Sequence, residues 1–264
     1  MTNVSGRSRD TDALDDPRQT GEMPFLKHLA ELRSVLLHSA AACIVGGVGG
    51  WWLSPIVMED LITRTVGTAV VLSPLEAFNE RIKLALLIGL MIATPYVFYR
   101  IWSFVVPGLM KKERSLILPM AMGSMVMFAL GVWGAYVYLL PVVISVMGKF
   151  MTPSMRPEIR VSTLLGLLYN LALVSGLVFQ LPLVTTALSA IGLVTPQGLL
   201  RHWRYAIVGV FLLTAIITPG DVVTAQIIMG VPMLFLYLLS VGLAWLVVRR
   251  RKKAEAAAEE EEDG

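Results

Sequence analysis

The stretch "SVLLHSAAACIVGGVGGWWLSPIVM" (residues 34–58) contains no charged side chain. As an α-helix it rises about 38 Å at 1.5 Å per residue. The hydrocarbon core of a bilayer is about 30 Å thick, so a helix of this length can cross it. The stretch therefore predicts a transmembrane helix, and the fold depends on how often such a run recurs.

Five further runs of this kind follow along the chain. They cover residues 84–99, extended past Arg100, and then 115–148, 161–200, 205–220 and 222–248. A charge at the bilayer centre costs about 3 kcal/mol, so uncharged runs mark membrane spans. Of the 264 residues, 56% are hydrophobic and only 16% are charged. We expect an all-α membrane protein with six transmembrane helices between residues 25 and 248.

The two ends of the chain differ from this apolar region. Residues 1–24 are polar and lack apolar periodicity, so we expect a disordered tail rather than a signal peptide. Residues 249–264 combine a basic block with an acidic run and predict a solvated, charged tail. Most of the 22 basic residues lie near the ends and in the second and fourth loops. The positive-inside rule then places both termini in the cytoplasm.

Nothing in the sequence predicts an enzyme or a cofactor site. Cys43 is the only cysteine, and the three histidines, His28, His38 and His202, lack the spacing of metal ligands. No glycine-rich phosphate loop follows a strand pattern. We expect no catalytic activity, no metal, no cofactor and no nucleic-acid partner.

Prolines inside the apolar runs predict a curved bundle. Each removes a backbone donor and bends or interrupts its helix; they are Pro95, Pro119, Pro141, Pro182 and Pro232. The run 205–220 rises only about 24 Å, which is shorter than the bilayer core. This run either thins the bilayer or depends on Arg204 and Tyr205 to reach the interface.

Tyr169, Leu173, Gly176 and Gln180 fall on one stripe of the helix expected at 161–200. A small residue there allows close approach of another helix, and a buried amide needs a hydrogen-bond partner. Gln180 is therefore a candidate for an interhelical hydrogen bond, either structural or to a partner protein.

Two acidic residues, Glu31 and Glu113, lie at helix ends on the side expected to face the cytoplasm. Both can be locally paired surface charges, with Arg33 and Arg114 as neighbours. Alternatively, the two carboxylates together can bind a ligand with two guanidinium groups, because the planar donor fork of arginine matches a carboxylate.

Several dispersed motifs resemble one known family. They are "MPFLKHLAELRSVL" (23–36), "SPLEAFNERIK" (73–83), "PYVFYRIWSFVVPGLMKKERS" (95–115), "FQLPL" (179–183) and "ITPGDVVTAQ" (217–226). In order and spacing these motifs resemble TatC, a subunit of the twin-arginine protein translocase of the bacterial inner membrane.

The resemblance implies a glove-like bundle of six helices with short helices five and six, and a receptor for twin-arginine signal peptides of folded precursors. It implies single-span TatA and TatB partners, self-association, and the proton-motive force as energy source. Glu31 and Glu113 match the signal-peptide-binding acids of the family, and Lys111 and Lys112 lie in the same loop. Other positions linked to function match Arg33, Pro55, Phe104, Pro107 and Asp221. Where many members carry a glutamate this chain has Gln180, so a protonatable group is not essential there.

Two other classes of protein remain alternatives on the sequence alone. A small secondary transporter requires ionisable groups within its spans. Here Arg100 and Asp221 lie only at the edges of the bilayer, and the two halves show no inverted repeat. A membrane scaffold that only gathers other proteins is harder to separate from a receptor, and saturable binding of a two-arginine peptide distinguishes them.

Overall fold

The computed structural model describes residues 19–109, 117–152, 154, 158–217 and 223–262. In these residues the chain is helical apart from turns and a single isolated β-bridge. The elements are α1 (Gln19–Thr65), α2 (Pro74–Leu109), α3 (Ile117–Gly134), the π-helical turn η2 (Ala135–Leu139), α4 (Leu140–Gly148), α5 (Val161–Val178), α6 (Leu181–Ala190), α7 (Pro196–Arg201), α8 (Trp203–Ile217) and α9 (Val223–Glu262).

Five helical segments among these residues are long and apolar enough to cross a membrane. They are His28–Thr65, Pro74–Val106, Ile117–Gly148, Val161–Ala190 and Met229–Arg249, and Trp203–Ala215 is a shorter apolar helix. The run expected at 205–220 thus forms α8, which has 15 residues. The apolar part of helix six, Met229–Arg249, has 21 residues and is the shortest of the five segments, but it lies within α9, which has 40 residues. Its charged end is rich in alanine, glutamate and lysine, which are strong helix formers, so the helix continues beyond the apolar part.

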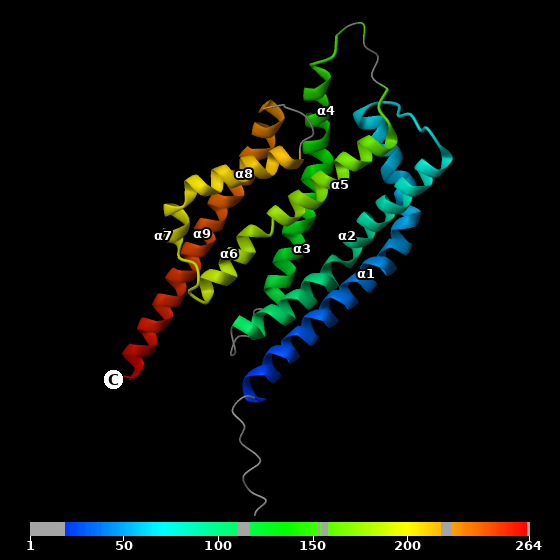
Figure 1. Ribbon diagram of the computed structural model, residues 1–264. Coiled ribbons are helices and arrows are strands. Elements are labelled where there is room, and N and C mark those ends of the chain that lie inside the picture. The colour runs from blue at the N-terminus through cyan, green and yellow to red at the C-terminus, as the bar shows by residue number, and fades with distance from the viewer. Residues whose placement is uncertain (1–18, 110–116, 153, 155–157, 218–222, 263–264) are drawn as a thin grey trace, which may run out of the picture.

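The long helices α1 and α2 pack side by side as an antiparallel pair (Figure 1). Their closest approach is at glycines, where the backbones nearly touch. A Cβ atom built on Gly50 would lie 2.3 Å from the carbonyl oxygen of Ala85, and one on Gly89 would lie 2.2 Å from the backbone nitrogen of Gly47. In hydrocarbon, close packing of small residues replaces the hydrophobic driving force between helices. The glycines therefore set the distance between α1 and α2.

Two of the remaining spans are interrupted next to prolines, as the sequence predicts, whereas Pro95, Pro119 and Pro232 lie inside α2, α3 and α9. The π-helical turn η2 comes immediately before Pro141, which has no N–H to continue the regular ladder. A second break separates α5 from α6 at Phe179 and Gln180, just before Pro182. The buried core gathers side chains from α3, α4 and α5, with contributions from α1, α2 and α9.

A small cap closes the end of the bundle where α1 meets α2. Gly67 adopts a φ of 76°, which glycine tolerates best, and its N–H bonds the carbonyl oxygen of Ile62 to end α1. Beyond this turn, Val70 forms a parallel bridge with Arg160. This bridge holds the α1–α2 loop against the start of α5.

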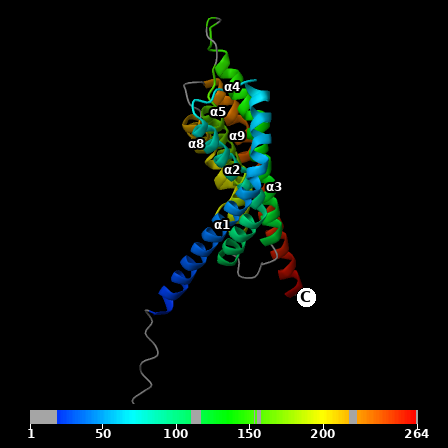
Figure 2. The same cartoon turned by 90° about the vertical axis from the view of Figure 1, so that its right-hand side faces the viewer.

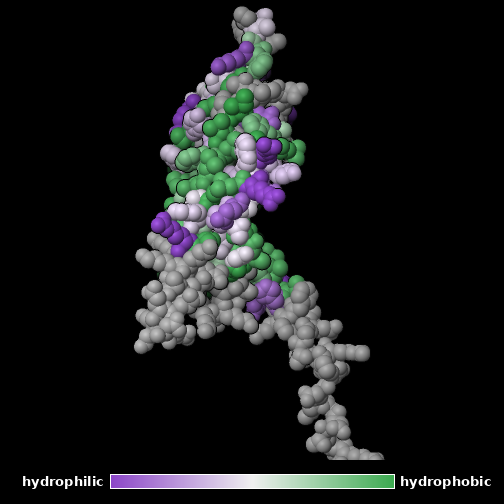
Figure 3. All heavy atoms as spheres, turned by 90° about the vertical axis from the view of Figure 1, so that its left-hand side faces the viewer, coloured by the Kyte–Doolittle hydropathy of each residue, from purple (hydrophilic) through white to green (hydrophobic). Residues whose placement is uncertain are grey.

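The first turns of α1 lean away from the other helices, as Figure 2 shows. The start of α1, the end of α2, the start of α3 and the end of α9 all lie at the lower end in Figure 1. The space-filling view of one face shows a broad hydrophobic area interrupted by separate hydrophilic groups (Figure 3). Large apolar side chains such as Val208, Leu212 and Phe235 are more than half exposed. Lipid contact accounts for such exposure.

Candidate functional site

A pocket of about 870 Å³ lies where the start of α1, the end of α2 and the start of α3 meet. Each helix contributes one wall. The lining residues are Glu31, Ser34 and Val35 from α1, Tyr99, Arg100, Ser103 and Phe104 from α2, and Ile117 and Leu118 from α3. Two residues predicted for the site, Glu31 and Phe104, are thus brought together.

The side chain of Glu31 is 56% exposed, and its carboxylate lies 3.9 Å from Nδ1 of His28. Among the described residues, His28 is the ion-pair partner of Glu31. The pair is ionic only when the histidine is protonated. Among the residues that the structure describes, Glu31 forms no ion pair with Arg33. Arg114, the neighbour of Glu113, lies outside the described residues. Glu31 therefore presents a carboxylate to the pocket with much of its surface free to receive a cation.

Phe104 forms the apolar side of the same pocket and fixes α1 against α2. Its ring stacks on the His28 imidazole, with centroids 4.2 Å apart and planes inclined by 16°. Such contacts contribute about 0.5–1.5 kcal/mol beyond the burial of area. The stack therefore positions the helix turn that carries Glu31.

Arg100 is a pocket residue that was not among the predicted site residues. Its Nη2 donates to the Oγ atom of Ser34 over 3.3 Å, while its buried Nε has no partner among the described residues. An arginine within an apolar run was the signal that could have identified it, because ionisable groups in spans mark functional sites. The pocket thus combines a carboxylate, an apolar wall and a guanidinium.

The other predicted residues lie apart from this pocket or outside the described residues. Arg33 and Pro55 are exposed on α1. Pro55 cannot donate to the carbonyl oxygen of Trp51, and the hydroxyl of Ser54 donates to it instead, over 2.9 Å. Pro107 lies in the last turn of α2. Lys111, Lys112, Glu113 and Asp221 fall in segments 110–116 and 218–222, outside the described residues.

Gln180 takes part in a polar connection between three helices. Its amide nitrogen donates to the backbone carbonyl oxygen of Ser124 over 3.1 Å. The indole Nε1 of Trp102 donates to the hydroxyl of the same serine over 2.8 Å, and Ser124 is fully buried. The expected interhelical hydrogen bond of Gln180 therefore exists within the chain. Ser124 and Trp102 were not predicted from the sequence, because neither breaks the pattern of its run.

Apolar helices in one bundle, with a polar pocket at one end of it, define a multi-pass membrane protein. Residues 27–232 match the family model of the Sec-independent protein translocase protein TatC. TatC of Koribacter versatilis is 33% identical over 235 residues, covering 85% of this chain and 86% of the relative. TatC of Aquifex aeolicus is 32% identical over 234 residues, covering 86% and 97%.

The likeness extends to three dimensions. A crystal structure of the twin arginine translocase receptor TatC superposes with a TM-score of 0.73 at 31% identity, covering 83% of this chain and 99% of that one. The chain belongs to the TatC family and is a component of the Sec-independent protein translocase.

Proposed function

We propose that the chain is the receptor for twin-arginine signal peptides of folded precursor proteins at the cytoplasmic face of the inner membrane. The observation that carries the proposal is the half-exposed Glu31 carboxylate in the pocket. Segment 110–116, which includes Glu113, joins the end of α2 to Ile117, another lining residue. In the sequence, Glu113 thus lies four residues before a residue that lines the same pocket as Glu31.

The chemistry of the pocket suggests how such a peptide lies. A guanidinium forms two parallel hydrogen bonds with a carboxylate, which a lysine ammonium cannot do. Arg100 repels a further cation inside the pocket, so we place the paired arginines near Glu31 and Glu113. Val35, Phe104 and Leu118 offer apolar surface for the hydrophobic region that follows the arginines in a signal peptide. Lys111 and Lys112 then adjoin the bound peptide.

We place six crossings of the membrane in the chain, with both termini in the cytoplasm. The crossing that the five long helices do not supply is the short helix α8, which comes fifth along the chain, before α9. Two observations support this topology. The start of α1 and the end of α9 lie at the same end of the bundle (Figure 1). In the sequence, many basic residues lie near the two ends of the chain, and the positive-inside rule places such residues in the cytoplasm. The pocket then faces the cytoplasm.

Photocrosslinking in oriented vesicles tests the site and its side together. A photoreactive residue at position 113 should crosslink a twin-arginine precursor added to inside-out vesicles, which expose the cytoplasmic face. The two-lysine version of the precursor is the matched control and should crosslink far less. Equal crosslinking of both versions would contradict the proposal, and crosslinking only in right-side-out vesicles would reverse the topology.

We infer TatA and TatB as single-span partners, with self-association of the receptor and the proton-motive force as energy source. Gln180 suits a contact with a partner helix, since its amide nitrogen is bonded to Ser124 while its amide oxygen remains as an acceptor. Arg33 and Pro55 are exposed on α1 and are also available for partner contacts.

Replacing Gln180 by leucine should separate its hydrogen bond within the chain from its contact with a partner helix. Loss of the bond to Ser124 should lower the stability of the isolated chain by about 1 kcal/mol, measured by thermal unfolding. If the amide oxygen contacts a partner, copurification of TatA or TatB should also fall severalfold. Gln180→Glu keeps an oxygen acceptor and should retain the partners. Wild-type copurification by the leucine variant would show that this contact is dispensable.

A further inference from the structure

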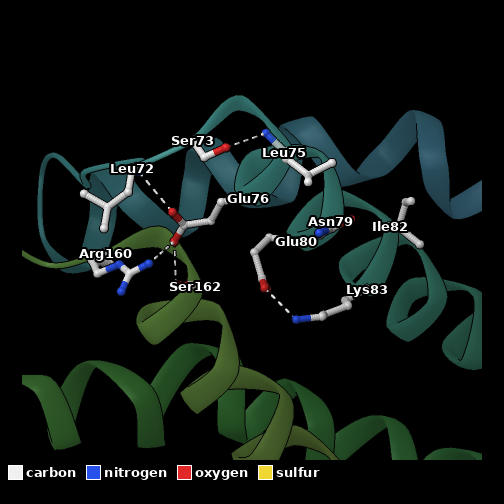
Figure 4. Close-up of a pocket in the computed structure, with 10 residues that line it drawn as sticks. All are labelled: Leu72, Ser73, Leu75, Glu76, Asn79, Glu80, Ile82, Lys83, Arg160 and Ser162. Carbon is white, nitrogen blue, oxygen red and sulfur yellow. Dashed lines mark hydrogen bonds and ion pairs between the residues drawn. The ribbon is translucent and has the colours of Figure 1, made fainter.

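A second pocket, of about 560 Å³, lies at the opposite end of the bundle, beside the loop between α1 and α2 and the start of α5 (Figure 4). Four charged side chains line it: Glu76, Glu80, Lys83 and Arg160. The two carboxylates and the two cations balance each other. The twin-arginine site uses none of these residues.

Glu76 accepts three hydrogen bonds and thereby holds the pocket together. Its Oε2 accepts the backbone N–H of Leu72 over 3.0 Å. Its Oε1 accepts the hydroxyl of Ser162 over 2.5 Å and an N–H of Arg160 over 3.5 Å. Figure 4 shows these bonds joining the start of α2 to the start of α5. The Arg160 side chain is nevertheless half exposed, so its other donors remain accessible.

Glu80 is different, because only half of its carboxylate is satisfied. The side chain is 5% exposed, and Oε1 accepts Nζ of Lys83 over 2.7 Å. Oε2 has no partner among the described residues. Tyr169 is close by, but its hydroxyl donates to the backbone carbonyl of Glu80 rather than to the carboxylate. A buried, half-satisfied anion requires another donor, and its soft terminal torsion lets it turn toward one that enters the pocket.

Lys83 also borders an apolar trough that begins where the polar pocket ends. The trough has a volume of about 290 Å³ and follows α2 and α5 into the membrane-spanning region. Leu86, Leu87 and Leu90 line one side, and Tyr169 and Leu173 line the other. A molecule that fills both hollows needs a charged head and an apolar chain, joined near Lys83.

We propose that this composite site binds phosphatidylethanolamine. The primary ammonium donates to the Glu80 carboxylate, and the phosphate accepts from Lys83 and Arg160. One acyl chain lies along the trough. A zwitterion matches a pocket with two charges of each sign, whereas an anionic headgroup leaves Glu80 without its donor. A choline headgroup has no N–H to donate. The proposal does not depend on the twin-arginine site.

Native mass spectrometry of the purified full chain tests the headgroup, with lipids of identical acyl chains. The chain should bind phosphatidylethanolamine about tenfold more tightly than phosphatidylcholine, which corresponds to one charge-assisted hydrogen bond. Glu80→Gln should remove this preference, and Glu158→Gln, on the exposed segment before α5, should leave it unchanged. Equal binding of the two lipids by the wild-type chain, or preference for phosphatidylglycerol, would overturn the proposal whether or not the Glu80 variant folds.

A second pair of variants tests the trough and separates a lipid from a free headgroup. Leu173→Trp fills the trough and should reduce phosphatidylethanolamine binding at least about fivefold, because the acyl chain loses its contact surface. Leu177→Trp, one turn further along α5 and more exposed, should bind like the wild type. Soluble phosphoethanolamine should compete only weakly. Full competition by phosphoethanolamine, or unchanged binding by Leu173→Trp, would show that the site does not hold a lipid chain.

Discussion

Replacing Gly89 by leucine should abolish the pairing of α1 with α2 and leave little folded protein in the membrane. A Cβ atom added at this position would lie 2.2 Å from the backbone nitrogen of Gly47 and 2.5 Å from its Cα atom. These are backbone atoms, so no side chain can rotate away and the helices must separate. Separation removes the closest contact of the two longest membrane-spanning helices. The yield of monodisperse protein after detergent extraction measures the effect.

Gly49 and Gly50, neighbours on α1, allow a matched test of the glycine contact between α1 and α2. Gly50→Ala places a methyl group 2.3 Å from the carbonyl oxygen of Ala85 and should destabilise by about 1–3 kcal/mol, as overpacking does. Gly49→Ala meets only the end of Ile92, at 3.8 Å. Alanine favours helix by up to about 1 kcal/mol over glycine, so this variant should be neutral or slightly more stable. Similar thermal unfolding of Gly49→Ala and Gly50→Ala would contradict the role assigned to the glycine contact.

Five of the six expected spans correspond to long apolar helices, and they could be predicted from the sequence because the cost of a buried charge acts on each segment separately. The same holds for the bends at Pro141 and Pro182, since a missing N–H is a local property. Pairing between helices is not local. The run containing Gly46 to Gly50 predicts a span equally well whichever helix packs against it, so its contact with Gly89 emerges only in the structure. The length of α9 was also missed, because charge marks the end of the membrane rather than the end of a helix.

Only part of the candidate site could be predicted from the sequence, because the site depends on how the helices pack against one another. Glu31 and Phe104 were identified through the family motifs, and the structure places them in one pocket. Arg100 and Ser34 were not, although both line it. A serine in an apolar run gives no signal, and an arginine in such a run is a signal that a functional residue shares with one that only reaches the membrane interface. Only the packing of α1 against α2 and α3 shows that they face a common space.

Glu31→Ala and Glu113→Ala should each weaken binding of a twin-arginine peptide by well over tenfold while the protein still inserts and retains its partners. In the structure the Glu31 side chain is 56% exposed, and an exposed ion pair contributes less than about 1 kcal/mol. In the proposed complex, the bound peptide covers the pocket and excludes water. Removing one partner of a covered, hydrogen-bonded pair costs about 2–5 kcal/mol, which exceeds the 1.4 kcal/mol of a tenfold change.

Control variants and the salt dependence distinguish a peptide-binding role of Glu31 and Glu113 from that of ordinary surface charges. Glu59→Ala removes an exposed glutamate from the same helix, outside the pocket, and should bind peptide normally. Glu31→Gln should be less damaging than Glu31→Lys, because the amide keeps one acceptor and adds no repulsion. High salt should weaken wild-type binding only in part, since a covered pair is screened less than an exposed one. Normal binding by both alanine variants, measured by fluorescence titration of a labelled peptide, would mean that the arginines are recognised elsewhere and that Glu31 is only a solvated charge beside His28.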